Sequence, residues 1–158
     1  MSTTLPLTVR GKKMLDEELK RLIHQERPEV IRQIEEARSH GDLSENAEYD
    51  AAKEKQALVE GRIQDIQSKL AGAEIVDVSK IKSDKVVFGA KVRMIDYDTD
   101  KEVVYQIVGV DEADVKQGLI SILSPIARGL IGKKVGDVAV VSSPKGEKEF
   151  EILELIFE

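Results

Sequence analysis

Two long helical patterns, joined by one short polar turn, constrain the fold of this chain more than any other feature. The first runs from Thr8, a candidate N-cap, to about Ser39, and the second runs from about Glu45 to Leu70. The seam of the second occupies two heptad positions: Tyr49, Gln56, Ile63 and Leu70 at one, and Ala52, Val59, Ile66 and Ala73 at the other. Narrow seams with charged outer faces predict an antiparallel two-helix coiled coil.

Pro28 interrupts the first helical pattern. Proline lacks an amide donor and its ring crowds the preceding turn, so we expect either a kink or a break after which Pro28 restarts the helix. Beyond it, Val30, Ile34 and Ala37 continue the apolar stripe. Small side chains near the polar turn would let the two helices approach closely there: Ala37, Ala47, Ala51 and Ala52.

After about residue 82 the sequence changes to Val- and Ile-rich runs of strand length, separated by turn residues. The expected elements are strands at 86–96 (bulged at Gly89), 103–108, 119–123, 138–141 and 149–156, and a short helix at 125–130. Together the patterns predict an α+β protein in two domains. Residues 1–80 would form the antiparallel coiled-coil hairpin, and residues 81–158 a small antiparallel β domain with one short helix.

Composition excludes several classes of function. A net charge of −6 argues against free, sequence-independent binding to nucleic acid, which needs a basic surface. The absence of cysteine removes disulfides, thiolate metal sites and cysteine nucleophiles. No apolar run approaches the ~18 residues of a membrane span, and the first residues do not resemble a secretory signal. We therefore expect a cytoplasmic protein that does not contact membranes.

The polar turn brings four carboxylates close together in sequence: Asp42, Glu45, Glu48 and Asp50. One interpretation is structural, because Asp42 followed by Glu45 resembles a capping box at the start of the second helix. The other is an incomplete magnesium site, because Mg²⁺ prefers oxygen ligands and retains several waters. Two carboxylates at a protruding tip could complete a two-metal phosphodiester centre that another protein supplies. The spacing of these residues permits both interpretations.

A resemblance favours the second interpretation. The segment from Gly41 to Tyr49, Gly-Asp-Leu-Ser-Glu-Asn-Ala-Glu-Tyr, resembles the coiled-coil tip of the bacterial Gre transcript cleavage factors. The segments from Val110 to Asp114 and from Ile122 to Gly132 resemble their C-terminal domain. Leu43 and the scarcity of basic residues near the tip are more similar to the GreA type of this family than to the more basic GreB type.

The resemblance implies a transcription elongation factor that enters the secondary channel of backtracked bacterial RNA polymerase and stimulates cleavage of the RNA 3′ end, releasing arrested complexes. Asp42 and Glu45 would be the catalytic contribution, helping to bind a second Mg²⁺ that is shared with the polymerase and not held stably by the free protein. The C-terminal domain, similar in fold to FKBP-type proteins, would dock at the channel rim. We expect a monomer, not itself a nuclease, that meets nascent RNA and template DNA only within the elongation complex.

The same resemblance assigns supporting roles to further residues. Those expected to shape the tip are Asn46, Glu48 and Tyr49. Those expected to form the docking loop are Ser124, Pro125 and Ile126. Three basic residues could contact the RNA 3′ end, although such side chains more often form a solvated face: Arg38, Lys53 and Lys55.

Two other functions stay open. The protein could plug the channel without assisting cleavage. The similarity to FKBP-type proteins also raises prolyl isomerase activity, but such enzymes bind proline in an aromatic-lined pocket, and fold alone does not confer activity. The aromatic residues available in the C-terminal region are Phe88, Tyr97, Tyr105, Phe150 and Phe157.

Overall fold

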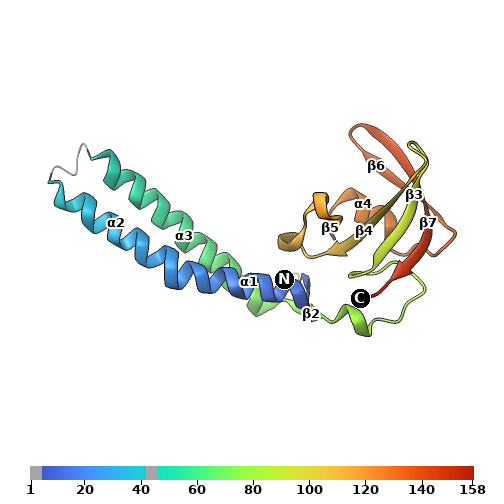
Figure 1. Cartoon of the computed structure of the whole chain (residues 1–158), viewed down its shortest axis with the longest axis horizontal. Coiled ribbons are helices and arrows are strands. Elements are labelled where there is room, and N and C mark those ends of the chain that lie inside the picture. Colours follow the sequence, from blue (N-terminus) through green and yellow to red (C-terminus); the bar gives the residue numbers. More distant parts are fainter. Residues whose placement is uncertain (1–4, 42–45) are drawn as a thin grey trace. The chain divides into compact units, whose positions relative to one another are not determined.

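The computed structural model describes residues 5–41 and 46–158, and their contacts divide the chain into two units (Figure 1). The first is a helical hairpin of residues 13–73, and the second combines the residues up to Lys12 with residues 74–158. The expected division between residues 80 and 81 differs from these contacts in two segments. Residues 5–12 and 74–80 lie with the C-terminal unit and not with the hairpin.

The first helical arm is continuous and has three parts: α1 (Val9–Arg21), the π-helical turn η1 (Leu22–Glu26) and α2 (Arg27–Ser39). Thr8 caps α1 as predicted, since its hydroxyl accepts a hydrogen bond of 2.9 Å from the Gly11 N–H. Arg21 and Arg27, which flank η1, keep right-handed helical angles, so Pro28 does not break the arm. The irregularity predicted at Pro28 is the wider π-helical turn just before it, where a missing amide donor disturbs the bonding pattern.

The second arm is α3 (Ala47–Gly72), which packs against α2 and η1. The buried seam consists of Leu15, Leu22, Val30, Ile34 and Ala37 from the first arm and Ala52, Val59, Ile63 and Ile66 from α3. The remaining predicted seam positions are only half-buried: Tyr49, Gln56, Leu70 and Ala73. Of the alanines expected to allow close approach, Ala37 and Ala52 are buried, whereas Ala47 and Ala51 are exposed.

Two arginine–glutamate pairs connect the arms through both carboxylate oxygens. Arg27 donates to Glu60 at 2.7 and 2.8 Å, and Arg62 donates to Glu18 at 2.8 Å in both bonds. Exposed ion pairs contribute little energy, but bidentate pairs constrain geometry, so these pairs specify the register of the two arms. In the described part of the chain, no helix is both long enough and apolar enough to cross a membrane.

The C-terminal unit contains a five-stranded sheet in the order β5-β4-β3-β7-β6 (Figure 1). Its strands are β3 (Lys91–Asp96), β4 (Lys101–Val108), β5 (Leu119–Ser121), β6 (Val138–Ser143) and β7 (Gly146–Ile156). All pairs are antiparallel except β4 with β5, which is parallel. The α+β class is confirmed, but the prediction of a purely antiparallel sheet is wrong. The chain returns between β4 and β5 through two 3₁₀ turns, η4 (Val110–Glu112) and η5 (Val115–Gln117).

The first strand of the sheet is shorter than predicted. β3 begins at Lys91, and the preceding residues form a turn in which Gly89 has a φ of +90°, a conformation that favours glycine. The predicted bulge is not at Gly89. The pairing of β3 with β7 shifts register between Arg93 and Met94 instead.

The core of the C-terminal unit lies between the sheet and α4 (Pro125–Leu130). Its buried members are Val86, Ala90, Val92, Met94, Ile107, Ile120, Ala127, Leu130, Ala139, Val141, Phe150 and Ile152. Gly129 allows α4 to approach β6 closely, because a Cβ there would lie 3.0 Å from the carbonyl oxygen of Val140. The C-terminal end of α4 is thus packed closely on the sheet.

Two short strands form a second sheet that the sequence did not predict. β1 (Pro6–Thr8) pairs in parallel with β2 (Glu74–Val76), and β2 leads into a 3₁₀ turn, η3 (Val78–Lys80). Leu7 in β1 is only 5% exposed and lies against Gly109, where a Cβ would be 3.0 Å from its Cδ2. The N-terminal segment is therefore packed into the C-terminal unit.

Candidate functional site

The candidate site is the end of the hairpin, where α2 stops and α3 starts. Asp42 and Glu45, the expected catalytic and metal-binding residues, lie outside the described residues, as do Leu43 and Ser44. The structure describes the residues on both sides, up to Gly41 after α2 and from Asn46 before α3. Their contacts define how the two helix ends are held together.

Asn46 connects both helix ends through one side-chain amide. Its Oδ1 accepts a hydrogen bond of 3.0 Å from the Tyr49 N–H, which caps α3. Its Nδ2 donates a bond of 2.6 Å to the carbonyl oxygen of Ala37, in the last turn of α2. Asn46 is therefore the N-cap of α3, and the capping-box interpretation concerns Asp42 and Glu45, which lie outside the described residues.

Two further contacts join the same helix ends. His40 Nδ1 lies 3.1 Å from the Glu48 carboxylate, and the Arg38 guanidinium lies over the ring of Tyr49, 5.9 Å from its centroid. The second contact has cation–π geometry. Since the side chains of His40 and Glu48 are 52% and 71% exposed, their pair orients the helix ends more than it stabilises them. We call the Asn46–Ala37, His40–Glu48 and Arg38–Tyr49 contacts the tip clasp.

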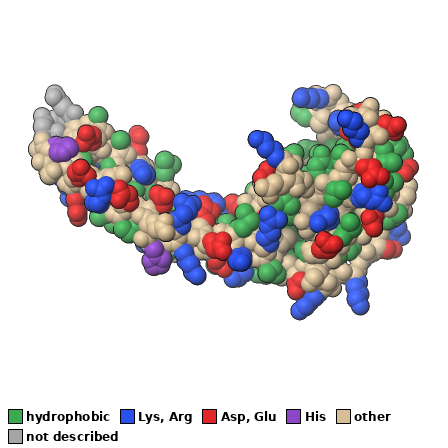
Figure 2. Space-filling model, viewed as in Figure 1, with side chains coloured by type: hydrophobic (Ala, Val, Ile, Leu, Met, Phe, Trp, Pro, Cys, Tyr) green, Lys and Arg blue, Asp and Glu red, His purple; other side chains and the backbone are tan. Residues whose placement is uncertain are grey.

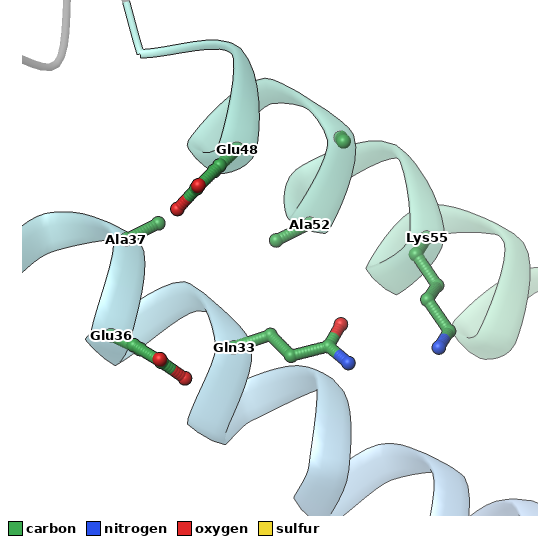
Figure 3. Close-up of a pocket in the computed structure, with 7 residues that line it drawn as sticks. Gln33, Glu36, Ala37, Glu48, Ala52 and Lys55 are labelled. Atoms are coloured by element: carbon green, nitrogen blue, oxygen red, sulfur yellow. The ribbon is translucent and has the colours of Figure 1, made fainter.

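The three basic residues expected to contact RNA each have a different environment. Arg38 belongs to the tip clasp, Lys53 Nζ donates a 3.1 Å bond to Gln56, and Lys55 lines a groove between α2 and α3 (Figure 3). The other residues that line the groove are Gln33, Glu36, Ala37, Glu48, Ala51 and Ala52. On the face shown in Figure 2, acidic and basic side chains alternate along the hairpin. The RNA contact stays a prediction.

The described residues provide no metal site of their own. Among residues 5–41 and 46–158, no group of three or more His, Asp or Glu side chains is placed to hold a metal ion. The side-chain chemistry of Asp42 and Glu45 fits Mg²⁺, because carboxylate oxygens are its preferred protein ligands. Two carboxylates supply only part of an octahedral shell, so any such ion must take its remaining ligands from water or a partner.

The expected docking loop forms the first turn of α4. Ser124 caps the helix, since its Oγ accepts a 3.2 Å bond from the Ala127 N–H, and Pro125 occupies the first helical position. Leu123 is 49% exposed, Pro125 is exposed, and Ile126 is half-buried. The Ser-Pro pair therefore has a structural role as a helix start, and the side chains around it present an apolar surface to solvent.

The buried carboxylate of Glu112 was not predicted from the sequence. This residue lies in η4, is 4% exposed, and accepts a 2.6 Å hydrogen bond from the hydroxyl of Thr8. A short 3₁₀ turn has no periodic pattern that could mark an inward-facing acid. The one available signal was Gly11, because a glycine inside a helical pattern often indicates a close approach. A Cβ at Gly11 would lie 2.8 Å from Glu112 Oε2.

Comparison with known proteins covers nearly the whole chain. A family model described as "Transcription elongation factor, N-terminal" matches residues 5–75, and one described as "Transcription elongation factor, GreA/GreB, C-term" matches residues 81–156. A protein of Trichlorobacter lovleyi named transcription elongation factor GreA is 56% identical over 158 residues, which is 100% of both chains. The protein of the same name from Maricaulis maris is 59% identical over 149 residues, 94% of this chain and 95% of that one. Among solved structures, the GreA factor homolog 1 protein of Thermus thermophilus is 27% identical over 98% of this chain and 99% of that chain, with a TM-score of 0.45.

Proposed function

This chain belongs to the GreA/GreB family of transcription elongation factors, and we propose that it acts by presenting Asp42 and Glu45 to the active centre of a backtracked bacterial RNA polymerase. The hairpin enters the secondary channel of the polymerase, and the polymerase then cleaves the extruded RNA 3′ end. Elongation resumes from the new, aligned terminus. The protein works in the bacterial cytoplasm as a monomer and meets nascent RNA and template DNA only inside the elongation complex.

The tip clasp is the observation that carries this proposal. It joins the two helix ends at the residues that flank the segment containing Asp42 and Glu45. Because Asn46 supplies the cap of α3, the first turn of that helix does not require either carboxylate. This supports a role for Asp42 and Glu45 in binding rather than in folding.

The two carboxylates have a limited chemical role in this proposal. Asp42 and Glu45 would supply oxygen ligands to a Mg²⁺ ion that the polymerase also binds, and they would orient water there. In two-metal cleavage, the pair of ions would stabilise the attacking and leaving oxygens of the phosphodiester. Two carboxylates alone compensate poorly for dehydration of Mg²⁺, so the free protein does not retain the ion and has no nuclease activity of its own.

Docking is assigned to the C-terminal unit. The first turn of α4 offers Ser124, Pro125 and Ile126 to the polymerase, with the exposed Leu123 beside them. Because Ala127 and Leu130 of α4 are buried in the core of the unit, the surface around this turn is held in place. A firmly held surface of this kind suits recognition, since little conformational freedom is lost on binding.

Prolyl isomerase activity finds no support in the packing of the aromatic residues. Phe150 belongs to the core, and Phe88, Tyr105 and Phe157 pack against it. Tyr97 donates a 2.9 Å hydrogen bond to Glu151. Packing within the unit and a surface hydrogen bond account for these side chains, so their contacts give no support to a proline pocket.

The decisive experiment compares Asp42→Asn with Asp50→Asn, which makes the same charge change at an exposed position of α3. Asp42→Asn should lower the rate of RNA cleavage in backtracked complexes by roughly 100-fold or more, because even residues that only orient metal ligands contribute about 10–100-fold. Asp50→Asn should cleave like the wild type. Both variants should keep the melting temperature and the ability to compete for polymerase. Normal cleavage by Asp42→Asn would remove the metal-binding role.

A second arm of the experiment separates cleavage assistance from the two alternatives. Purified protein and labelled RNA are incubated with Mg²⁺, with and without a backtracked polymerase. We expect shortened RNA only when polymerase is present. Cleavage of free RNA, abolished by Asp42→Asn, would make the protein an autonomous nuclease. Slowed transcription without any shortened RNA would make it a channel-plugging regulator.

A further inference from the structure

Glu112 is a buried acid that the proposed function does not use. Its side chain is 3% exposed, and its Oε2 accepts a 2.6 Å hydrogen bond from the hydroxyl of Thr8, 104 residues away in sequence. Thr8 is itself only 4% exposed. A buried carboxylate is costly unless hydrogen bonds and favourable charges compensate for its lost hydration. The surroundings of Glu112 should therefore contain that compensation.

The start of α1 supplies it. Thr8 is the N-cap of α1, so the Glu112 carboxylate lies at the N-terminal end of this helix, where the helix dipole favours negative charge. The first turn of α1 contains no acidic residue of its own. Arg10 adds an opposite charge, with its Nε 3.8 Å from Glu112 Oε1. Glu112 thus provides the acid that the helix start lacks.

Gly11 makes this approach possible. A Cβ at this position would lie 2.8 Å from Glu112 Oε2 and 3.3 Å from Thr8 Oγ1, so a larger residue would displace the carboxylate. Glycine is unfavourable inside a helix, which makes its presence in α1 informative. The first turn of α1 is shaped to receive an acid from outside the helix.

The same N-terminal segment is fixed to the C-terminal unit by two other contacts. β1 pairs with β2, and Leu7 packs against Gly109, the residue immediately before η4. Backbone pairing, apolar packing and the Thr8–Glu112 bond therefore act on adjacent residues. Among them, only the Thr8–Glu112 bond engages the helix start directly.

We propose that Glu112 is a positioning residue: by binding the N-cap of α1 it fixes the first helical arm to the C-terminal unit, so that docking of this unit is transmitted to the tip. The inference rests on the proposed function, in which the C-terminal unit docks and the hairpin delivers Asp42 and Glu45. α1 begins among the residues of the C-terminal unit and continues into the hairpin. The firmness with which its first turn is held then determines how reproducibly the arm is presented.

The test uses three variants of the full-length protein. Glu112→Met removes the acceptor at similar side-chain size and leaves the Thr8 cap to Gly11 intact. Glu112→Gln keeps an oxygen acceptor at the same volume. Arg10→Ala is the matched control, because it removes a long contact from a side chain that is 58% exposed and leaves the Thr8–Glu112 bond in place.

Three quantities are measured: competition with labelled wild type for a backtracked polymerase, the cleavage rate at saturating factor, and hydrogen exchange of the Gly11 N–H. For Glu112→Met we expect the cleavage rate at saturating factor to fall about 10- to 100-fold, because small misplacements of reacting groups reduce rates by this much. The ability of this variant to compete with labelled wild type for the polymerase should stay within about twofold of the wild-type value. The Gly11 N–H should exchange faster. Glu112→Gln should recover most of the cleavage, and Arg10→Ala should match the wild type within about twofold.

Other outcomes overturn the proposal. Wild-type cleavage by Glu112→Met at saturation would show that the bond does not position the tip. Lost competition with normal cleavage at saturation would make Glu112 a support of the docking unit alone. If Glu112→Met does not fold, Thr8→Val removes the same bond together with the cap to the Gly11 N–H, and Thr8→Asp, which keeps a cap but cannot donate to Glu112, separates the two losses. Asp42→Asn, measured in parallel, separates the two hypotheses: if it cleaves normally the proposed function fails, and if it is inactive while Glu112→Met is normal, only the positioning role fails.

Discussion

The hairpin and the C-terminal unit bury apolar side chains in different ways. In the C-terminal unit, residues such as Met94 and Ile152 are completely buried between a sheet and α4, with neighbours in several strands. In the hairpin, a seam residue such as Ile63 is buried against one opposing helix, and the flanking residues are charged and solvated. A change in the C-terminal unit should therefore spread through its core, whereas a change in the hairpin should stay local.

Because of this difference, stability and geometry depend on the same contacts in the C-terminal unit but on different contacts in the hairpin. The core of the C-terminal unit determines both its stability and the placement of its surface. In the hairpin, the seam contributes the stability, while exposed polar contacts such as Arg27–Glu60 and the tip clasp fix register and geometry at little energetic gain. Substitutions in the hairpin can therefore disturb function while leaving stability almost unchanged.

The largest effect is expected from a cavity in the C-terminal unit. Met94→Ala removes a fully buried side chain from the centre of β3 and should cost about 2–5 kcal/mol of unfolding free energy. Ile63→Ala, at 2% exposure in the hairpin, should cost less, because two helices can close over the space and water can reach it. Denaturant unfolding followed by circular dichroism measures both. Equal costs would contradict the contrast between the two units.

An intermediate effect is expected at Asn46. Asn46→Ala removes the cap of α3 and should cost about 0.5–2 kcal/mol, whereas Asn46→Asp keeps a good cap and should cost much less. Aspartate cannot donate to the Ala37 carbonyl, so both variants lose the cross-helix bond of the tip clasp. Cleavage assays should therefore show both variants impaired, despite their different stabilities. Full activity in Asn46→Asp would mean that the cap alone matters.

The smallest effect is expected on the stability of the hairpin at low pH. The hydrogen bond from Arg27 lowers the pKa of Glu60 below its ordinary value. A carboxylate with a lowered folded-state pKa contributes stability above its unfolded pKa, about 4.3, and loses that contribution as the pH falls toward the folded value. Melting of the hairpin should thus shift slightly and salt-dependently below about pH 4.3. Glu60→Gln should flatten this part of the profile, and an unchanged profile in Glu60→Gln would contradict the prediction.

The helical half of the fold could be predicted closely because its signal is periodic. Ile63 and Ile66 recur at heptad spacing, and Thr8 precedes an apolar pattern as an N-cap should. The parallel pairing of β4 with β5 could not be predicted, since a three-residue strand such as β5 has no direction that its sequence reveals. The pairing of β1 with β2 was missed for a related reason: two such strands lie far apart in the chain.

The site shows the same limit. Asp42 and Asn46 are both good N-caps, and the sequence alone gave no reason to prefer Asn46; only the start of α3 decides between them. The contact of His40 with Glu48 depends on how the two helix ends face each other, which spacing does not determine. Glu112 looked like one more surface acid in an acidic segment, because its burial depends on Thr8 and Gly11 at the other end of the chain.

The π-helical turn η1 has a consequence for the spacing of the seam. One row of buried residues on the first arm is separated by seven, eight and seven positions: Leu15, Leu22, Val30 and Ala37. One row of buried residues on α3 is separated by seven positions at each step: Ala52, Val59 and Ile66. In a regular α-helix one extra residue would rotate everything beyond it by about 100°. Because η1 accommodates the extra residue within its own turn, the buried faces of α1 and α2 keep the same orientation. An insertion that would have rotated the end of the first arm away from α3 is therefore limited to a local widening of one turn.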